Sequence, residues 1–245
     1  MTDFLDTPSG RSIAYHRTQG QGTGIVFLGG FMSDMDGTKA TALEAWAKSL
    51  GRPFLRFDYS GHGQSDGKFV DGCIGEWAQD AQAAIEALTD GPQVIVGSSM
   101  GGWIALLMSQ RISAKVAGLV GIAAAPDFTE DSFLAGFSPD QIIELEENGV
   151  VMVPSGYGDP YPITSKLIED GRQNLVLRTP LPLPFPVRFL QGTMDSSVDR
   201  SVALRLLDHA DGDDVALSFV KGADHSFSTP ECLTLIETAI LNVTP

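Results

Sequence analysis

The chain has 245 residues, of which 43% are hydrophobic, so it can bury one sizeable core, and an α/β fold of this length is often a single domain. The formal net charge of −15 makes the surface repel phosphates and anionic lipid headgroups, so we expect neither a nucleic acid nor a membrane as a partner. The N-terminus has no basic start and no apolar stretch typical of a signal peptide, and we expect a cytoplasmic protein.

The predicted elements alternate between strands and helices along most of the chain. A turn at Pro8-Ser9-Gly10 separates two extended stretches and predicts a hairpin near the N-terminus. Short apolar runs then predict strands that are buried on both faces of a sheet, and segments with helical spacing follow them. The strands are expected at 25–30, 53–60, 93–97 and 116–125, and the helices at 36–51, 73–91 and 101–112. This order predicts a doubly wound, mostly parallel sheet.

The alternation stops at Pro126 and resumes with a strand at 186–195, a helix at 201–210, a strand at 215–223 and a helix at 229–243. Within the interruption, Ser138 and Gln141 form a capping box and Gly149 ends the helix that it opens. A small hairpin or irregular loop at 149–164, a short helix at 165–173 and a proline-rich return follow. We therefore expect a single domain over residues 1–245 with a small cap inserted at about 126–186, over the carboxyl edge of the sheet.

The sequence Gly97-Ser98-Ser99-Met100-Gly101 lies between a predicted strand and a predicted helix. This pattern, G-x-S-x-G, is typical of a nucleophile elbow, in which the central serine projects above the sheet and the glycines allow a tight turn. Ser99 is therefore the predicted nucleophile, and Ser98 fills the variable position. Gly/Ser-rich turns also occur as plain connectors, so the motif needs a base and an acid to support it.

Chain order identifies both partners. His225 follows the last predicted strand at the carboxyl edge, whereas the other histidines lie in the early hairpin, in a turn and on an amphipathic helix: His16, His62 and His209. Asp195 ends another strand, which gives the order Ser99, Asp195, His225 expected of an α/β-hydrolase. Asp127 is an alternative acid in a variant geometry. Asp224 is expected to fix the histidine loop, and Asp199 to begin or face the next helix.

An oxyanion hole requires two backbone N–H groups. We expect one from Met100, directly after the nucleophile, and the other from Phe31, which follows Gly29-Gly30 at the exit of a strand. The ring of Phe31 is also expected to wall the pocket. The alternative interpretation of the two glycines is a flexible strand exit.

The triad order, "GSSMGGW" and "RFDYSGHGQSDG" resemble the α/β-hydrolase superfamily. More closely, "FLGGFMSDMDGTKA", "LRFDYSGHGQSDG", "DGPQVIVGSSMGGWIAL" and "KGADH" resemble the family of the mitochondrial palmitoyl-protein thioesterase that also cleaves mycophenolic acid acyl-glucuronide. The resemblance covers nearly the whole chain and implies Ser99 as nucleophile, Asp195 as acid and His225 as base. It also implies that Asp58 and Ser65 cap a structural turn. Gly29-Gly30-Phe31 stands where we expect Pro-Gly-Tyr in that relative, so the pocket wall lacks a hydroxyl.

The predicted activity is hydrolysis of carboxylic esters or thioesters, with a small-molecule ester or an acylated protein as substrate and no metal or organic cofactor. The expected substrate-binding residues are Phe31, Met32, Phe128, Phe133 and Phe137, and Met152 and Tyr157 are further candidates for an apolar slot. Two alternatives stay open: hydrolysis of a C–C bond in a diketone-like substrate, and a ligand receptor with negligible turnover. The sequence does not give the oligomeric state. Cys73 and Cys232 are expected to be reduced bystanders.

Overall fold

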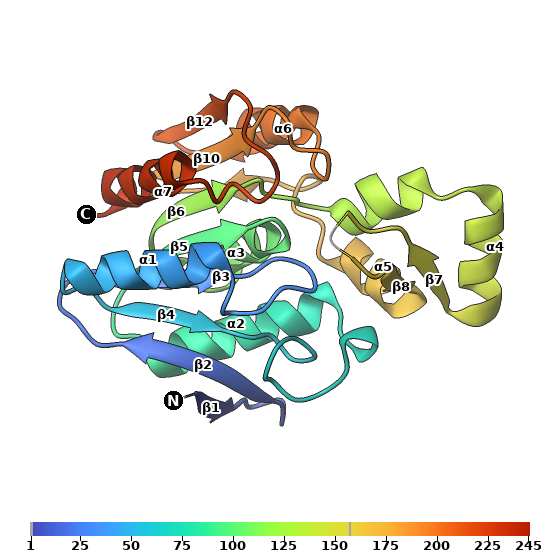
Figure 1. The fold of residues 1–245 in the computed structure, drawn as a ribbon, viewed down its shortest axis with the longest axis horizontal. Coiled ribbons are helices and arrows are strands. Elements are labelled where there is room, and N and C mark those ends of the chain that lie inside the picture. Colours follow the sequence, from blue (N-terminus) through green and yellow to red (C-terminus); the bar gives the residue numbers. More distant parts are fainter. Residues whose placement is uncertain (1, 157) are drawn as a thin grey trace.

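The structure is a computed structural model that describes residues 2–156 and 158–245. Its main sheet has the strand order β1-β2-β4-β3-β5-β6-β10-β12 (Figure 1). These strands are β1 (Asp3–Asp6), β2 (Ser12–Thr18), β3 (Ile25–Leu28), β4 (Phe54–Phe57), β5 (Gln93–Ser98), β6 (Val116–Ile122), β10 (Val187–Gly192) and β12 (Val215–Val220). The predicted N-terminal hairpin is confirmed, since β1 and β2 pair antiparallel. From β4 to β12 the neighbours pair in parallel, which confirms the predicted sheet.

Helices cover both faces of the sheet, because successive side chains along a buried strand point to opposite faces. In β3, Val26 and Leu28 pack in the core that α2 and α3 complete, whereas Ile25 and Phe27 pack in the core that α1 and α7 complete. The helices of these layers are α1 (Thr38–Ser49), α2 (Ile74–Leu88), α3 (Met100–Arg111), α6 (Arg200–His209) and α7 (Pro230–Val243). Short 3₁₀ turns, η1 (Phe69–Asp71) and η2 (Ser113–Lys115), complete the connections.

The segment between β6 and β10 carries its own elements, which gather at one side of the sheet (Figure 1). They are the π-helical turn η3 (Thr129–Leu134), α4 (Pro139–Asn148), the antiparallel pair β7 (Val150–Val153) and β8 (Tyr161–Thr164), and α5 (Ser165–Gln173). The two-residue strand β9 (Leu181–Pro182) then pairs with β11 (Ala210–Asp211). The predicted capping box is confirmed, with Ser138 and Gln141 at the start of α4 and left-handed Gly149 at its end.

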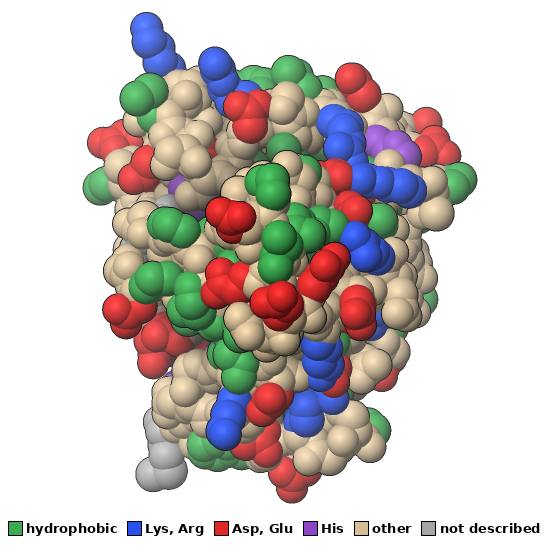
Figure 2. Space-filling model, turned by 90° about the vertical axis from the view of Figure 1, so that its right-hand side faces the viewer, with side chains coloured by type: hydrophobic (Ala, Val, Ile, Leu, Met, Phe, Trp, Pro, Cys, Tyr) green, Lys and Arg blue, Asp and Glu red, His purple; other side chains and the backbone are tan. Residues whose placement is uncertain are grey.

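The face that carries these elements mixes acidic and hydrophobic side chains (Figure 2). Ile143 on α4 is 50% exposed. In the described part of the chain, no helix has both the length and the apolar character needed to cross a bilayer.

Candidate functional site

Ser99 lies at the sharp turn between β5 and α3. Its backbone has φ 55° and ψ −119°, a combination that residues other than glycine seldom adopt. The flanking glycines are required by space: a β-carbon on Gly97 would lie 2.3 Å from the carbonyl oxygen of Gly101, and one on Gly101 would lie 2.1 Å from that of Leu28. The turn therefore holds the half-buried Ser99 hydroxyl above the sheet, at the start of α3.

His225 links Ser99 to Asp195 through both ring nitrogens. Its Nε2 atom is 3.1 Å from Ser99 Oγ, and its Nδ1 atom is 2.8 Å from Asp195 Oδ2. Asp195 comes from the loop after β10 and His225 from the loop after β12, so two parallel strands deliver them to the same edge of the sheet. The three predicted side chains thus form one continuous series of hydrogen bonds.

Asp195 is held by four donors. The N–H groups of Ser197 and Val198 bind Oδ1 at 2.8 and 2.9 Å, and the amide of Gln191 binds Oδ2 at 2.9 Å beside His225. Burial acts to raise the pKa of Asp195, but the hydrogen bonds from His225 and these N–H groups outweigh it and lower that pKa. The carboxylate is therefore charged at neutral pH. Gln191 was not identified from the sequence, where only its place before Asp195 at the end of a strand could have indicated it.

The alternative acid, Asp127, lies elsewhere. Its carboxylate accepts hydrogen bonds from the N–H groups of Val176 and Leu177 at 2.8 and 3.0 Å and forms an ion pair with Arg178 at 2.7 Å. Asp131 on η3 binds the same arginine as well as Arg205 of α6. Asp127 therefore ties the start of the inserted segment to its return, and it is not the partner of His225.

The other polar residues have local roles. Asp199 caps α6 and Asp224 accepts a hydrogen bond from the N–H of Phe227, as the sequence predicted. Asp58 and Ser65 lie in the same turn, and the Ser65 hydroxyl donates a hydrogen bond to the Asp58 carbonyl oxygen at 2.7 Å. His62 lies in that turn, buried, and it is absent from the cavity lining.

The loop after β3 brings Phe31 next to Ser99. A β-carbon on Gly30 would lie 3.5 Å from Ser99 Cβ, so the loop passes directly beside the elbow. Within residues 2–156 and 158–245, no hydrogen-bond acceptor faces the N–H of Phe31. Met100 is the first residue of α3, where N–H groups have no partner within the helix. Phe31 and Met100 thus both lie near Ser99, and their role as oxyanion donors stays a prediction.

A cavity of about 590 Å³ opens at Ser99 and His225. One side is aromatic: the ring of Phe31 contacts those of Phe128, Phe133 and Tyr161 at centroid distances of 5.4 to 5.9 Å. Met32 also lines the cavity, as predicted, and Tyr161 is an addition that its place in the irregular loop did not reveal.

Two residues that were expected in the cavity wall lie outside its lining. Phe137, just after η3, is not part of the lining; it packs against the apolar core, as Phe128 and Phe133 also do. Met152 is not part of the lining either, since its side chain is 50% exposed on β7. Tyr157 lies outside the described residues.

The cavity lining also contains polar residues. Lys39 at the start of α1 is one of them and donates a hydrogen bond to the carbonyl oxygen of Ser226, the residue after His225. Burial lowers the pKa of Lys39, against the opposing charge of Asp224. Besides Ser98 and Ser99, the serine and threonine residues in the lining are Ser33, Thr38, Ser132, Ser155, Ser196, Ser197, Ser226 and Ser228. Among the described residues, no group of acidic, histidine or cysteine side chains is arranged to hold a metal ion.

Comparisons with known proteins agree with this architecture. A family model described as the alpha/beta hydrolase fold matches residues 25–173. The solved structure of a protein from Agrobacterium vitis S4 has a TM-score of 0.96 and 38% identity, covering 100% of this chain and 99% of that chain. Mouse alpha/beta hydrolase domain-containing protein 10 has a TM-score of 0.91 and 33% identity, covering 99% and 97% of the two chains.

A curated relative from Bos taurus, "Palmitoyl-protein thioesterase ABHD10, mitochondrial", is 37% identical over 224 residues, which cover 91% of this chain and 73% of that protein. The Homo sapiens protein of the same name is 36% identical over 225 residues, with the same coverage of 91% and 73%. The mitochondrial designation of these relatives contradicts the cytoplasmic location expected from the sequence, and that expectation is withdrawn. The chain therefore belongs to the alpha/beta hydrolase family, and it is a hydrolase of the ester or thioester type.

Proposed function

We propose that the chain cleaves carboxylic esters or thioesters through an acyl-enzyme formed on Ser99. The observation that carries the proposal is the series of hydrogen bonds from Ser99 through His225 to Asp195 at the mouth of a cavity with an aromatic wall. The relatives named as palmitoyl-protein thioesterases support the same type of reaction.

In the acylation step, His225 Nε2 takes the hydroxyl proton of Ser99 while Oγ attacks the acyl carbonyl carbon. The electron pair of the carbonyl moves to its oxygen, and the N–H groups of Phe31 and Met100 bind this oxyanion. Asp195 fixes the ring through Nδ1 and stabilises the imidazolium. The tetrahedral species then collapses, the bond to the leaving oxygen or sulfur breaks, and His225 gives its proton to the leaving group.

Deacylation repeats these steps with water. His225 removes a proton from the water molecule, whose oxygen attacks the acyl carbon, and the oxyanion again forms between the two N–H groups. Ser99 leaves with the proton from His225, so the products are the carboxylic acid and the alcohol or thiol. Each proton and electron pair is accounted for by the three side chains and water.

The cavity suggests how the substrate is divided. The acyl chain fits the side formed by Phe31, Phe128, Phe133 and Tyr161, since each methylene buried there gains about 0.8 kcal/mol. The leaving group then faces the part of the lining that carries Lys39 and hydroxyl groups. A small-molecule ester or an acylated protein satisfies this division.

Pre-steady-state kinetics with p-nitrophenyl esters from acetate to palmitate, beside thioesters of the same acyl chains, test the proposal. We expect a burst of leaving group equal to the enzyme concentration, and an acyl mass increase on the peptide that contains Ser99. A single turnover without steady-state release would identify a receptor. Faster cleavage of a dienol-ketone than of any ester would identify a C–C hydrolase, and an adduct elsewhere would refute Ser99 as nucleophile.

A further inference from the structure

His62 lies in the turn after β4 and contacts the loop that carries Phe31. Its Nδ1 atom is 3.2 Å from the carbonyl oxygen of Ser60, and its Nε2 atom is 3.3 Å from the backbone nitrogen of Met32. A carbonyl oxygen only accepts, so Nδ1 carries the proton, and the lone pair of Nε2 accepts the N–H of Met32. The neutral ring thus connects two backbone segments, one on each side.

The surroundings of His62 keep the ring neutral and in place. The rings of Tyr59, Phe69 and Trp77 pack against it edge-on, with centroid distances of 5.6, 5.1 and 5.0 Å. The side chain is almost fully buried, and this burial lowers its pKa to about 4. Nε2 therefore remains an acceptor over the whole neutral range.

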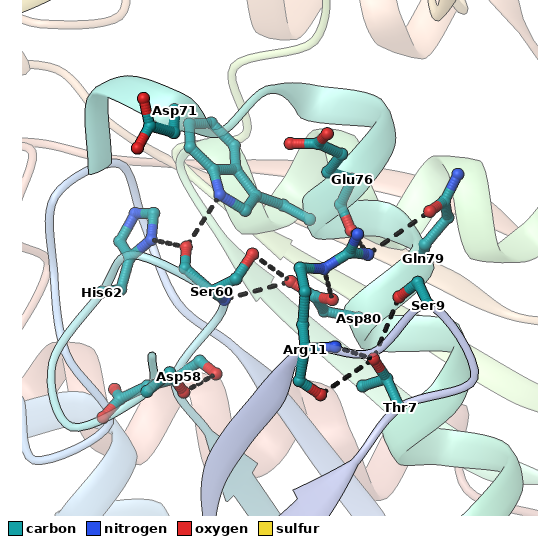
Figure 3. Close-up of polar contacts among 12 residues, drawn as sticks. Thr7, Ser9, Arg11, Asp58, Ser60, His62, Asp71, Glu76, Gln79 and Asp80 are labelled. Atoms are coloured by element: carbon teal, nitrogen blue, oxygen red, sulfur yellow. Dashed lines mark hydrogen bonds and ion pairs between the residues drawn. The ribbon is translucent and has the colours of Figure 1, made fainter. Parts of the chain in front are cut away.

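The acceptor of His62 Nδ1–H is itself fixed by a buried polar network (Figure 3). The N–H and hydroxyl of Ser60 both bind Asp80 Oδ2, at 3.0 and 2.7 Å, and Arg11 pairs with Asp80 Oδ1 at 2.7 Å. Trp77 Nε1 donates to the same Ser60 carbonyl oxygen at 3.1 Å. Asp80, on α2, is completely buried and pairs with Arg11 just before β2, so this network gives His62 a rigid support.

The backbone that His62 binds is strained. Met32 has φ 53°, in the left-handed region that side chains other than glycine avoid. Such a conformation persists only where its surroundings hold it, and here the Met32 N–H is held by His62 while Asp58 accepts the N–H of Met35 at 2.6 Å. The N–H of Phe31 belongs to the neighbouring peptide, between Gly30 and Phe31, one residue before the N–H that His62 holds.

We propose that His62 is a positioning residue for the oxyanion hole: by holding the N–H of Met32, it fixes the direction of the Phe31 N–H toward the acyl oxygen. The inference rests on the proposed function of Ser99 and Phe31. The contact between His62 and Met32 strengthens binding of the charged oxygen in the tetrahedral species and does not change substrate binding. It therefore affects kcat more than KM.

Two variants separate this role from a structural one. His62→Gln places an amide oxygen near the position of Nε2 and keeps an acceptor for the Met32 N–H, whereas His62→Asn keeps a donor toward the Ser60 carbonyl and loses that acceptor. Loss of one oxyanion donor costs about 100- to 1,000-fold in kcat, so a misdirected donor in His62→Asn is expected to cost at least about tenfold, with KM nearly unchanged. His62→Gln is expected to recover most of this loss.

An alkyl trifluoromethyl ketone, which forms a tetrahedral adduct with a serine, provides the second readout. Wild type and His62→Gln are expected to bind it at least about tenfold more tightly than His62→Asn, in line with the kcat ratio. Failure of wild type to form the adduct would refute the proposed function of Ser99. If wild type binds the ketone tightly but the two variants have equal affinity for it and equal kcat, the role of His62 would be overturned and the proposed function of Ser99 would stand.

A measurement on the unmodified protein covers the case in which His62→Asn does not fold. The ¹⁵N chemical shifts of the His62 ring are expected to report a neutral Nδ1–H tautomer from pH 8 to pH 5, consistent with a pKa of about 4. A ring that carries its proton on Nε2, or that becomes charged within this range, would overturn the inference because Nε2 could not accept the N–H of Met32.

Discussion

The side-chain amide of Gln191 donates a hydrogen bond to the same carboxylate oxygen of Asp195 that binds His225. The two distances to Asp195 Oδ2 are 2.9 Å from Gln191 Nε2 and 2.8 Å from His225 Nδ1. Gln191 is buried, and among the described residues its Oε1 atom has no hydrogen-bond partner. A buried amide with an unpaired acceptor is costly, which indicates that the N–H group of Gln191 serves to hold the Asp195 carboxylate in place.

Gln191→Met tests that use, because methionine has nearly the same shape and no polar group. Removal of the donor is partly offset by removal of the unpaired Oε1, so we expect unfolding free energy to change by less than about 1 kcal/mol. We expect kcat to fall about fivefold to tenfold as Asp195 and His225 lose orientation. Urea unfolding and steady-state kinetics measure the two quantities. A large loss of stability with unchanged kcat would make Gln191 a purely structural residue.

Asp195→Asn is predicted to leave the fold intact and to disable His225. The amide cannot stabilise the imidazolium, and it favours the wrong tautomer of the ring, a change that lowers kcat by about 10⁴ in the analogous protease triad. The measurement is kcat on a short p-nitrophenyl ester, together with the melting temperature.

Asp127→Asn is the matched control for that variant. Asparagine tolerates the left-handed backbone at this position, where φ is 59°, but its single carbonyl oxygen cannot serve Val176, Leu177 and Arg178 together. We expect a loss of about 1–3 kcal/mol in unfolding free energy and a change in kcat of less than about threefold. The reverse pattern, with kcat lost here and kept in Asp195→Asn, would identify Asp127 as the acid.

The framework of the fold could be predicted because its signals are local. Gly97 and Gly101 mark the elbow, the capping box at Ser138 marks α4, and the apolar runs mark strands buried on both faces. The order of Ser99, Asp195 and His225 then selected the side chains that meet, since parallel strands end at one edge of the sheet.

The remaining features depend on contacts between distant segments. Gln191, Lys39 and Tyr161 join the site only because β10, α1 and β8 are brought together in space, and no motif in the sequence marks them. The π-helical turn η3 was also not predicted; Phe133 within it lines the cavity, whereas Phe137, four residues later, does not. A uniform helical or loop pattern could not distinguish these two aromatic residues.

Phe133 and Phe137 therefore provide a matched pair of variants that tests whether the cavity wall selects the acyl chain. Phe133→Ala removes part of the aromatic wall, so each methylene that loses burial should cost up to about 0.8 kcal/mol, or about fourfold in kcat/KM. We expect the preference for long esters over acetate to fall at least about tenfold. Phe137→Ala is expected to lower the melting temperature while its chain-length profile stays parallel to wild type. The same shift in both variants would show that the cavity wall does not select the acyl chain.

The buried His62 predicts a pH dependence of stability. Its pKa falls from 6.5 to about 4 on folding because of burial, so the unfolded chain binds more protons between these values and stability rises with pH across this interval. The unfolding free energy is lowered by about 3 kcal/mol in total; this loss is complete below pH 4 and absent above about pH 7. Urea unfolding of His62→Gln is expected to show a shallower rise from pH 5 to pH 7 than wild type. Equal slopes would mean that the folded protein accepts a charged His62.

The identity of the nucleophile is tested most directly with a fluorophosphonate probe, which loses fluoride as a serine oxygen bonds to phosphorus. Peptide mapping by mass spectrometry then locates the label in wild type, Ser99→Ala and Ser98→Ala. The account predicts that the label lies on Ser99, disappears in folded Ser99→Ala and is largely retained in Ser98→Ala. A label on Ser98, or labelling that survives in Ser99→Ala, would contradict it.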